Sequence, residues 1–158
     1  ELLNAGFPVK TAVQIMNTAL VIGREDVRFS TIDVSLFDLY SGTCEFVKAG
    51  ASTTYIKHQR KVEKVHSVTL PIGVIQDLEI ETVTKDLESG DFVVMVTDGV
   101  IDALPPGRQE ELMETIIGET EIQNPKELAH HILGKVLEHS GEVPADDMTV
   151  LVVGIWKI

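Results

Sequence analysis

The chain has 158 residues, with 25 acidic against 13 basic side chains and a formal net charge of −12. This length suits one domain with a real core, and so acidic a surface argues against nucleic acid and membrane headgroups as partners. Hydrophobic residues make up 44%, as in an ordinary soluble protein. No apolar stretch approaches the roughly 20 residues of a membrane span, and no signal peptide is evident.

Four apolar residues repeat at helical spacing near the start of the chain: Val9, Val13, Met16 and Leu20. The pattern predicts a helix over 8–22, with a proline at its first position and a glycine just after its end. Because the sequence begins without an initiator methionine, we expect a fragment whose earlier segment belongs to the same domain.

The middle of the chain alternates apolar and polar side chains, the period-two pattern of β-strands. Strands are expected at six places, the first four forming two hairpins: 32–37, 43–49, 53–57, 62–65, 78–84 and 92–96. Helices are expected at 108–117 and 125–139, and a buried strand closes the chain at 148–156. This order predicts an α+β fold and not a doubly wound parallel sheet.

The single cysteine, Cys44, cannot form an internal disulfide, which fits a reducing cytoplasm. It lies in the predicted strand at 43–49, where a thiol usually serves as a small apolar core side chain. We therefore expect a structural residue and not a nucleophile.

Two acidic motifs stand beside strands that the sequence predicts to be buried. Asp98 and Gly99 directly follow the strand at 92–96, and Asp146 and Asp147 precede the last strand. A side chain in such a position is held by rigid scaffold, and a glycine lets backbone approach a ligand closely. Each motif alone also has an ordinary explanation. Asp98-Gly99 suits a turn or helix cap, and Asp146-Asp147 suits a solvated pair.

Taken together, these motifs resemble one family. The strand ending in Thr97-Asp98-Gly99, two helices and then Asp146-Asp147-Met148-Thr149-Val150 is similar to the metal-dependent protein phosphatases. Three upstream segments narrow the resemblance to the sporulation stage II type and its relatives that regulate sigma factors: Phe29-Ser30-Thr31-Ile32-Asp33, Lys48-Ala49-Gly50-Ala51 and Leu70-Pro71-Ile72-Gly73. The resemblance covers essentially the whole chain.

The resemblance implies a layered α-β-β-α sandwich of antiparallel strands flanked by helices, with two Mn²⁺ or Mg²⁺ ions at one edge. It carries Asp98 and Asp146 over as metal ligands and catalytic residues. Gly99 and Asp147 are carried over as supporting residues. Hard cations prefer oxygen ligands, and two of them can activate water for attack on a phosphoserine phosphorus.

One part of the family pattern is absent from the chain. The first ligands of the family come from an Asp-Gly-Met-Gly segment on an early hairpin, and residues 1–158 contain no such segment. We therefore expect a single phosphatase-like domain over 1–158, truncated at its amino terminus. We also expect the fragment alone to bind metal weakly, to be inactive and to self-associate.

In relatives, the helices before the first strand act with the Leu-Pro-Ile-Gly loop as a switch that completes the metal site. The matching positions lie on the helix at 8–22 and on that loop: Val13, Met16, Leu70, Pro71 and Gly73. The alternative is that Val13, Met16 and Leu20 are core residues. Both are compatible, because a switch must also bury its apolar stripe.

By resemblance, the function is that of a metal-dependent protein serine/threonine phosphatase. Its partner would be a phosphorylated anti-sigma-factor antagonist, and its role the control of sigma-factor activation in sporulation or stress response. The alternative is a catalytically silent module that keeps the fold and binds the partner. We expect a cytoplasmic location, and the interpretation leaves room for a homo-oligomer and for a membrane-tethered parent protein.

Overall fold

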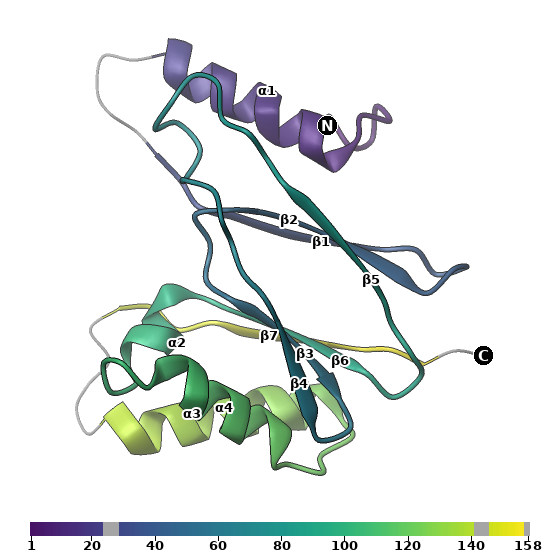
Figure 1. Ribbon diagram of the computed structural model, residues 1–158, viewed down its shortest axis with the longest axis vertical. Helices are drawn as coiled ribbons and strands as arrows, with labels where there is room; N and C mark the ends of the chain where they lie inside the picture. The colour runs from purple at the N-terminus through teal and green to yellow at the C-terminus, as the bar shows by residue number, and fades with distance from the viewer. Residues whose placement is uncertain (24–28, 141–145, 157–158) are drawn as a thin grey trace. The chain divides into compact units, whose positions relative to one another are not determined.

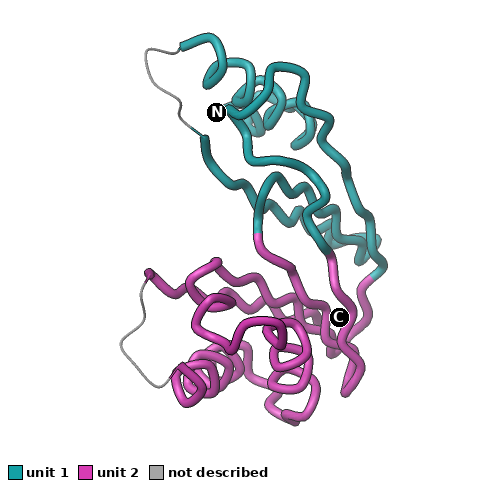
Figure 2. The backbone as a smooth tube through the Cα atoms, turned by 60° about the vertical axis from the view of Figure 1, so that its left-hand side comes forward, with its two compact units in different colours: residues 1–51, 66–86 teal, residues 52–65, 87–158 magenta. Residues whose placement is uncertain are grey.

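The computed structural model describes residues 1–23, 29–140 and 146–156 (Figure 1). The chain forms two compact units, each assembled from two separate stretches of sequence (Figure 2). Unit 1 contains residues 1–51 and 66–86, and unit 2 contains residues 52–65 and 87–158. Within the described residues, no helix is long and apolar enough to cross a membrane.

Unit 1 is a three-stranded antiparallel sheet with one long helix. The helix is α1 (Val9–Ile22), and the strands β1 (Ile32–Phe37), β2 (Thr43–Ala49) and β5 (Thr82–Asp86) pair in the order β1-β2-β5. Apolar side chains from α1, from β2 and from the segment before β5 form its core: Val9, Val13, Val47, Ala49, Ile72, Leu78 and Ile80. Alternation along β2 places Val47 and Ala49 on the same face of the sheet, the face that forms this core.

Unit 2 is a four-stranded antiparallel sheet with three helices. Its strands are β3 (Thr54–His58), β4 (Lys61–Val65), β6 (Phe92–Val96) and β7 (Val150–Gly154), in the order β4-β3-β6-β7. Its helices are α2 (Asp98–Asp102), α3 (Gln109–Gly118) and α4 (Pro125–Ser140). Strand and helix side chains share one core, which includes Tyr55, Phe92 and Val94 from the sheet and Met113, Leu128 and Ile132 from α3 and α4.

The two sheets and four helices found among the described residues confirm the predicted α+β class. Cys44 is fully buried, as expected of a core side chain. Burial, with a smaller effect from Glu45, raises the pKa of its thiol to about 12, which keeps the thiol protonated and unreactive.

Three local predictions differ from the structure. β5 begins at Thr82 and not at Leu78, because Leu78 and Ile80 are buried in the core without joining the strand ladder. The helix α2 was not expected, and it begins at Asp98 itself. The last strand is shorter than predicted, since β7 covers only Val150–Gly154.

Candidate metal centre

The two acidic motifs meet at one edge of the sheet in unit 2. β6 and β7 are antiparallel, and the last pair of their ladder is Val96 with Val150. The end of β6 and the start of β7 therefore lie side by side. Asp98 comes two residues after Val96, at the start of α2, and Asp146 comes four residues before Val150, in the segment that leads into β7.

Thr97 extends the contact beyond the ladder. Its backbone N–H donates to the carbonyl oxygen of Thr149 at 3.2 Å. Its hydroxyl donates to the carbonyl oxygen of Asp147 at 3.2 Å and accepts from the N–H of Thr149 at 2.9 Å. One threonine side chain thus ties the segment before β7 to the end of β6. In the sequence, Thr97 stands out only as part of the Thr97-Asp98-Gly99 motif, and no pattern marks it for this role.

Gly99 explains why the two segments can approach so closely. It is buried in the first turn of α2, and a Cβ at this position would lie 2.5 Å from the carbonyl oxygen of Asp147. No side chain fits there without moving backbone. The glycine therefore lets α2 pack directly against the Asp146-Asp147 peptide, so the supporting residues Gly99 and Asp147 touch each other.

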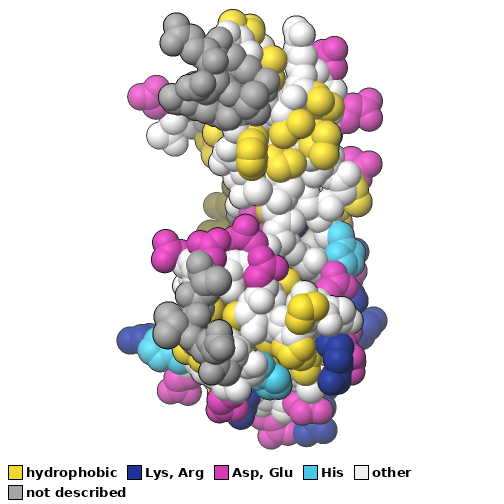
Figure 3. Space-filling view, turned by 90° about the vertical axis from the view of Figure 1, so that its left-hand side faces the viewer, with side chains coloured by type: hydrophobic (Ala, Val, Ile, Leu, Met, Phe, Trp, Pro, Cys, Tyr) yellow, Lys and Arg dark blue, Asp and Glu magenta, His cyan; other side chains and the backbone are white. Residues whose placement is uncertain are grey.

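The carboxylates of Asp98 and Asp146 are at the surface, and each is oriented by a neighbouring backbone amide. Asp98 Oδ1 accepts from the N–H of Gly99 at 3.1 Å, and Asp146 Oδ1 accepts from the N–H of Asp147 at 2.7 Å. Both residues are exposed. Figure 3 shows a group of acidic side chains (magenta) on the surface of unit 2.

The donor atoms fit a hard divalent cation in kind but do not complete a centre for two ions. Asp98 and Asp146 offer carboxylate oxygens, the ligands that Mn²⁺ and Mg²⁺ prefer. Within the described ranges, however, no group of three or more carboxylate, histidine or cysteine side chains is placed to hold an ion. Residues 1–23, 29–140 and 146–156 thus supply part of a ligand set.

The residues carried over as a switch all belong to unit 1. Val13 is buried, as the core interpretation predicts, and Leu20 packs against the same core. For Met16 the core interpretation is wrong, since 44% of this residue is exposed. Helical geometry places Met16 on the same face of α1 as Val9, Ala12 and Val13, where it lines a cavity of unit 1 with them.

The Leu-Pro-Ile-Gly loop is an ordered segment fixed to the sheet of unit 1. Ile72 exchanges two backbone hydrogen bonds with Ser30, at 2.9 and 3.0 Å. Pro71 packs on Gly50, where a Cβ would lie 2.5 Å from the proline ring. Leu70 is half exposed, and Gly73 has a φ of 87°, a conformation that glycine adopts readily.

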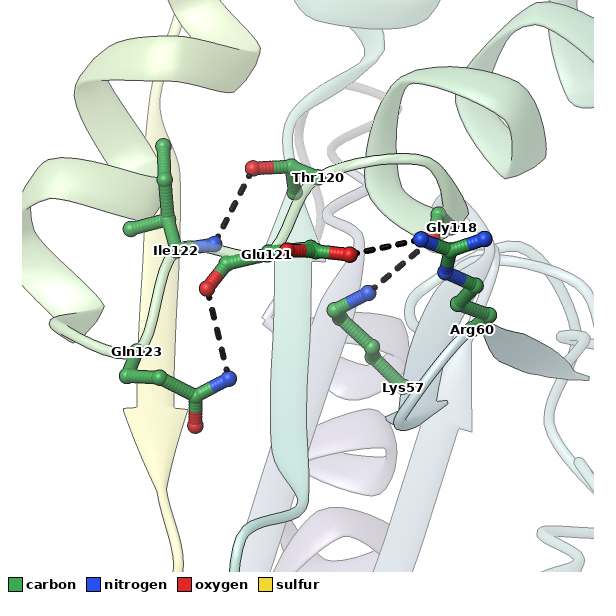
Figure 4. Close-up of polar contacts among 7 residues, drawn as sticks. All are labelled: Lys57, Arg60, Gly118, Thr120, Glu121, Ile122 and Gln123. Carbon is green, nitrogen blue, oxygen red and sulfur yellow. Dashed lines mark hydrogen bonds and ion pairs between the residues drawn. The ribbon is translucent and has the colours of Figure 1, made fainter.

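A second polar cluster in unit 2 lies at the far end of β6 from Asp98, beside the loop between α3 and α4 (Figure 4). The ammonium of Lys57 is buried and donates to the carbonyl oxygen of Gly118 at 3.2 Å. Arg60 pairs with Glu121 at 2.6 Å on the surface. A cation at the last carbonyls of a helix is a common structural stabiliser, so Lys57 acts as a cap for α3. Burial, with Arg60 nearby, lowers the pKa of Lys57.

Two cavities lie away from the acidic motifs. One of about 540 Å³ in unit 2 is lined by Arg60 and by α3 residues such as Glu111 and Glu114. The other, of about 570 Å³ in unit 1, is lined mainly by apolar side chains from the first turn, α1 and β1. Neither Asp98 nor Asp146 lines either cavity.

Comparison with known proteins identifies relatives along nearly the full chain. The model of the Stage II sporulation protein E (SpoIIE) family matches residues 1–156. Stage II sporulation protein E of Bacillus subtilis (strain 168) is 32% identical over 157 residues, which is 98% of this chain and 19% of that protein.

Two solved structures from Bacillus subtilis are similar in both sequence and fold. The phosphatase domain of the cell fate determinant SpoIIE, presoaked with Mn, is 31% identical with a TM-score of 0.75, covering 98% of this chain and 69% of that one. The SpoIIE PP2C phosphatase domain with a fragment of its regulatory domain is 31% identical with a TM-score of 0.89, covering 98% and 47%. The chain therefore spans only part of each relative.

Proposed function

We propose that this chain, which belongs to the stage II sporulation protein E family, is part of a metal-dependent protein serine/threonine phosphatase domain. It is homologous to PP2C-type phosphatase domains. The observation that carries the proposal is the meeting of Asp98 and Asp146 at neighbouring strand ends, with Gly99 packed on Asp147.

In this proposal Asp98 and Asp146 hold the metal centre, and the other residues keep them in place. Bound Mn²⁺ or Mg²⁺ would supply a water of lowered pKa and stabilise the charge that develops on the transferred phosphoryl group. Thr97 fixes the spacing between the two strand ends through its hydroxyl. The backbone N–H of Gly99 orients the carboxylate of Asp98, and the backbone N–H of Asp147 orients the carboxylate of Asp146. One oxygen of each carboxylate is held in this way, and the rigid edge of the sheet positions the other.

The remaining donors of a two-ion centre come, in this proposal, from protein outside the chain. The chain covers 69% of the solved SpoIIE phosphatase domain, so the other 31% of that domain is where matching donors are proposed to lie. We expect the isolated fragment to lack activity for this reason. The switch residues Val13, Met16, Leu70, Pro71 and Gly73 are likewise proposed to act in the intact protein.

The proposed substrate is a phosphoserine regulatory protein of the anti-sigma-factor antagonist type, acting in the cytoplasm. Its dephosphorylation would control sigma-factor activation. Support comes from membership in the stage II sporulation protein E family, whose Bacillus subtilis member is described as a cell fate determinant. A phosphoprotein substrate also fits a site of exposed carboxylates on an open surface, because a folded partner could not enter a deep pocket.

The second candidate is a catalytically silent module that binds the same partner. The incomplete ligand set within residues 1–23, 29–140 and 146–156 is the observation in its favour. The two candidates differ in what the acidic residues do. A silent module has no use for paired carboxylates oriented toward one edge, whereas an enzyme fails without them.

The test is Mn²⁺-dependent release of phosphate from a phosphoserine protein by the intact protein. We expect Asp98→Asn and Asp146→Asn each to abolish turnover while leaving the fold intact, because each removes an anionic ligand. Asp102→Asn is the matched control, since Asp102 is an exposed carboxylate on the same short helix α2. Near wild-type turnover by Asp98→Asn or by Asp146→Asn would contradict the assignment of these residues as metal ligands. An inactive wild-type protein that still binds its partner would establish the silent module.

A further inference from the structure

His58 is a partly exposed imidazole that stands between two carboxylates of unit 2. It is the last residue of β3, the strand that lies between β4 and β6 in the sheet. Its Nδ1 is 2.8 Å from Oδ2 of Asp91, and its Nε2 is 3.8 Å from Oε2 of Glu63. No short sequence motif links the three residues, because each comes from a different part of the sheet.

The register of the sheet brings these side chains together. Glu63 of β4 is the cross-strand partner of Ile56, and His58 lies two residues beyond Ile56 along β3. Because successive side chains of a strand alternate between the two faces, His58 and Glu63 share one face as diagonal neighbours. Asp91 directly precedes β6, on the other side of β3. One carboxylate therefore flanks the ring from each neighbouring strand.

Asp91 holds one nitrogen of the ring in a fixed position. Its side chain is only 6% exposed, and its Oδ2 also accepts from the backbone N–H of Glu88 at 2.7 Å. An ionised carboxylate can only accept, so the neutral His58 ring carries its proton on Nδ1 and keeps the lone pair on Nε2. Histidines that bind metals are usually oriented in this way, with the other ring N–H donated to a carboxylate.

The gap between His58 and Glu63 suits an ion better than a direct contact. At 3.8 Å, Nε2 and Oε2 are too far apart for a hydrogen bond. A tetrahedral zinc ion, with bonds of about 2.0–2.2 Å, holds two such ligand atoms about 3.3 Å apart. The two side chains are 30% and 37% exposed, so a small rotation of Glu63 closes the difference and water can reach the ion.

The donor set also indicates the kind of ion. An imidazole nitrogen beside a carboxylate suits Zn²⁺, whereas Mg²⁺ and Mn²⁺ prefer oxygen ligands. The parts of the chain that the structure describes hold no set of three such side chains placed for an ion. Two protein ligands are therefore available here, and water fills the remaining positions of an open site.

We propose that His58 and Glu63 form an open Zn²⁺ site on unit 2, in which Asp91 orients His58. A bound ion would join β3 to β4 beside the turn that connects them. The site is separate from the candidate metal centre, because Asp91 precedes β6 and Asp98 follows it. The proposal depends on contacts within unit 2 and not on the proposed phosphatase activity.

The test is a titration of the intact protein with Zn²⁺ at pH 7.5, followed by NMR through the nitrogen signals of the histidine rings. These signals report binding at His58 even if Zn²⁺ also binds elsewhere. We expect the Nε2 signal of His58 to shift as Zn²⁺ is added, and Mg²⁺ at the same concentrations to leave it unchanged.

Glu63→Gln should weaken Zn²⁺ binding at His58 at least about tenfold, because it removes an anionic ligand from the ion. Glu88→Gln is the matched control. It removes the same charge from an exposed residue whose backbone N–H, and not its side chain, bonds Asp91. This control should leave the affinity unchanged. Asp91→Asn should also weaken binding about tenfold by releasing the ring. If that buried change prevents folding, the exposed Glu63 variant still decides the question.

Three results would overturn the site. One is a His58 ring signal that does not move at millimolar Zn²⁺. Another is equal affinity in Glu63→Gln and the wild type, which would make His58 a solitary ligand. The third is an equal loss of affinity in Glu88→Gln and Glu63→Gln, because general attraction by acidic side chains would then explain the binding.

Discussion

At the scale of single residues, the candidate metal centre is shaped by backbone packing that a glycine permits. Gly99 in α2 lies against the carbonyl of Asp147, and Thr97 bonds the same carbonyl. The acidic residues were predictable from the sequence because Asp98 follows an apolar strand. The contact between Gly99 and Asp147 was not predictable, since it depends on how β6 pairs with β7.

Replacing Gly99 with alanine should destabilise unit 2 by about 1–3 kcal/mol, the usual range for overpacking. A Cβ would lie 2.5 Å from the carbonyl oxygen of Asp147, so α2 or the segment before β7 must move. Gly134→Ala is the matched control, because nothing lies within 4 Å of its Cβ position in the middle of α4. That change should stabilise by about 0.5–1 kcal/mol. Urea denaturation measures the free energy of unfolding of both variants, which should fall for Gly99→Ala and rise for Gly134→Ala. Equal changes in the two variants would contradict the close packing of Gly99 on Asp147.

Cys44 should resist alkylation in the folded protein. It is completely buried, and the pKa of its thiol is raised to about 12, chiefly by burial. The reactive thiolate is therefore scarce at pH 8. We expect iodoacetamide to modify it at pH 8 only when urea unfolds the chain, as followed by mass spectrometry. Rapid labelling of the native protein would contradict the core assignment.

At the scale of elements, most helices and strands follow from periodicity, and the exceptions have physical causes. Leu78 and Ile80 alternate as in a strand, yet they enter the core of unit 1 before the β5 ladder begins. The helix α2 is too short to show a helical period. The buried Asn17 of α1, whose side chain bonds the backbone of Gly73 and Ile75, gave no signal because these partners lie more than fifty residues away in sequence.

Two residues of the proposed switch lie on the apolar stripe of α1: Val13 is buried and Met16 is exposed. Their replacement by alanine should therefore change the free energy of unfolding by different amounts. Val13→Ala removes two buried methyl groups and should cost about 2 kcal/mol. Met16→Ala should cost less than about 1 kcal/mol, because 44% of the residue is already exposed. Thermal or urea denaturation of the two variants gives the comparison. A Met16→Ala loss equal to that of Val13→Ala would contradict the placement of the helix.

The same pair of variants also bears on the switch. A titration of activity with Mn²⁺ in the intact protein should show an altered metal requirement for folded Val13→Ala or Met16→Ala if α1 acts on the centre. An unchanged requirement would leave α1 as a core helix alone.

At the scale of the whole molecule, the chain is two compact units that belong to a family of larger proteins. Both acidic motifs lie in unit 2, and all the residues named for the switch lie in unit 1. Family resemblance gave the fold and the candidate ligands from the sequence. The number of donors that meet could not be predicted from the sequence, because it depends on which groups folding brings together.

The central claim is that Asp98 and Asp146 hold one metal centre, and a double-mutant cycle on Mn²⁺ affinity tests it most directly. The intact protein, Asp98→Asn, Asp146→Asn and the double variant are titrated with Mn²⁺ by calorimetry. Each single change should weaken binding by at least about tenfold, a loss that even outer-shell changes at metal sites reach. The double variant should bind little more weakly than either single one, because the two ligands act on the same centre. Losses that simply multiply, or wild-type affinity in either single variant, would contradict the shared centre.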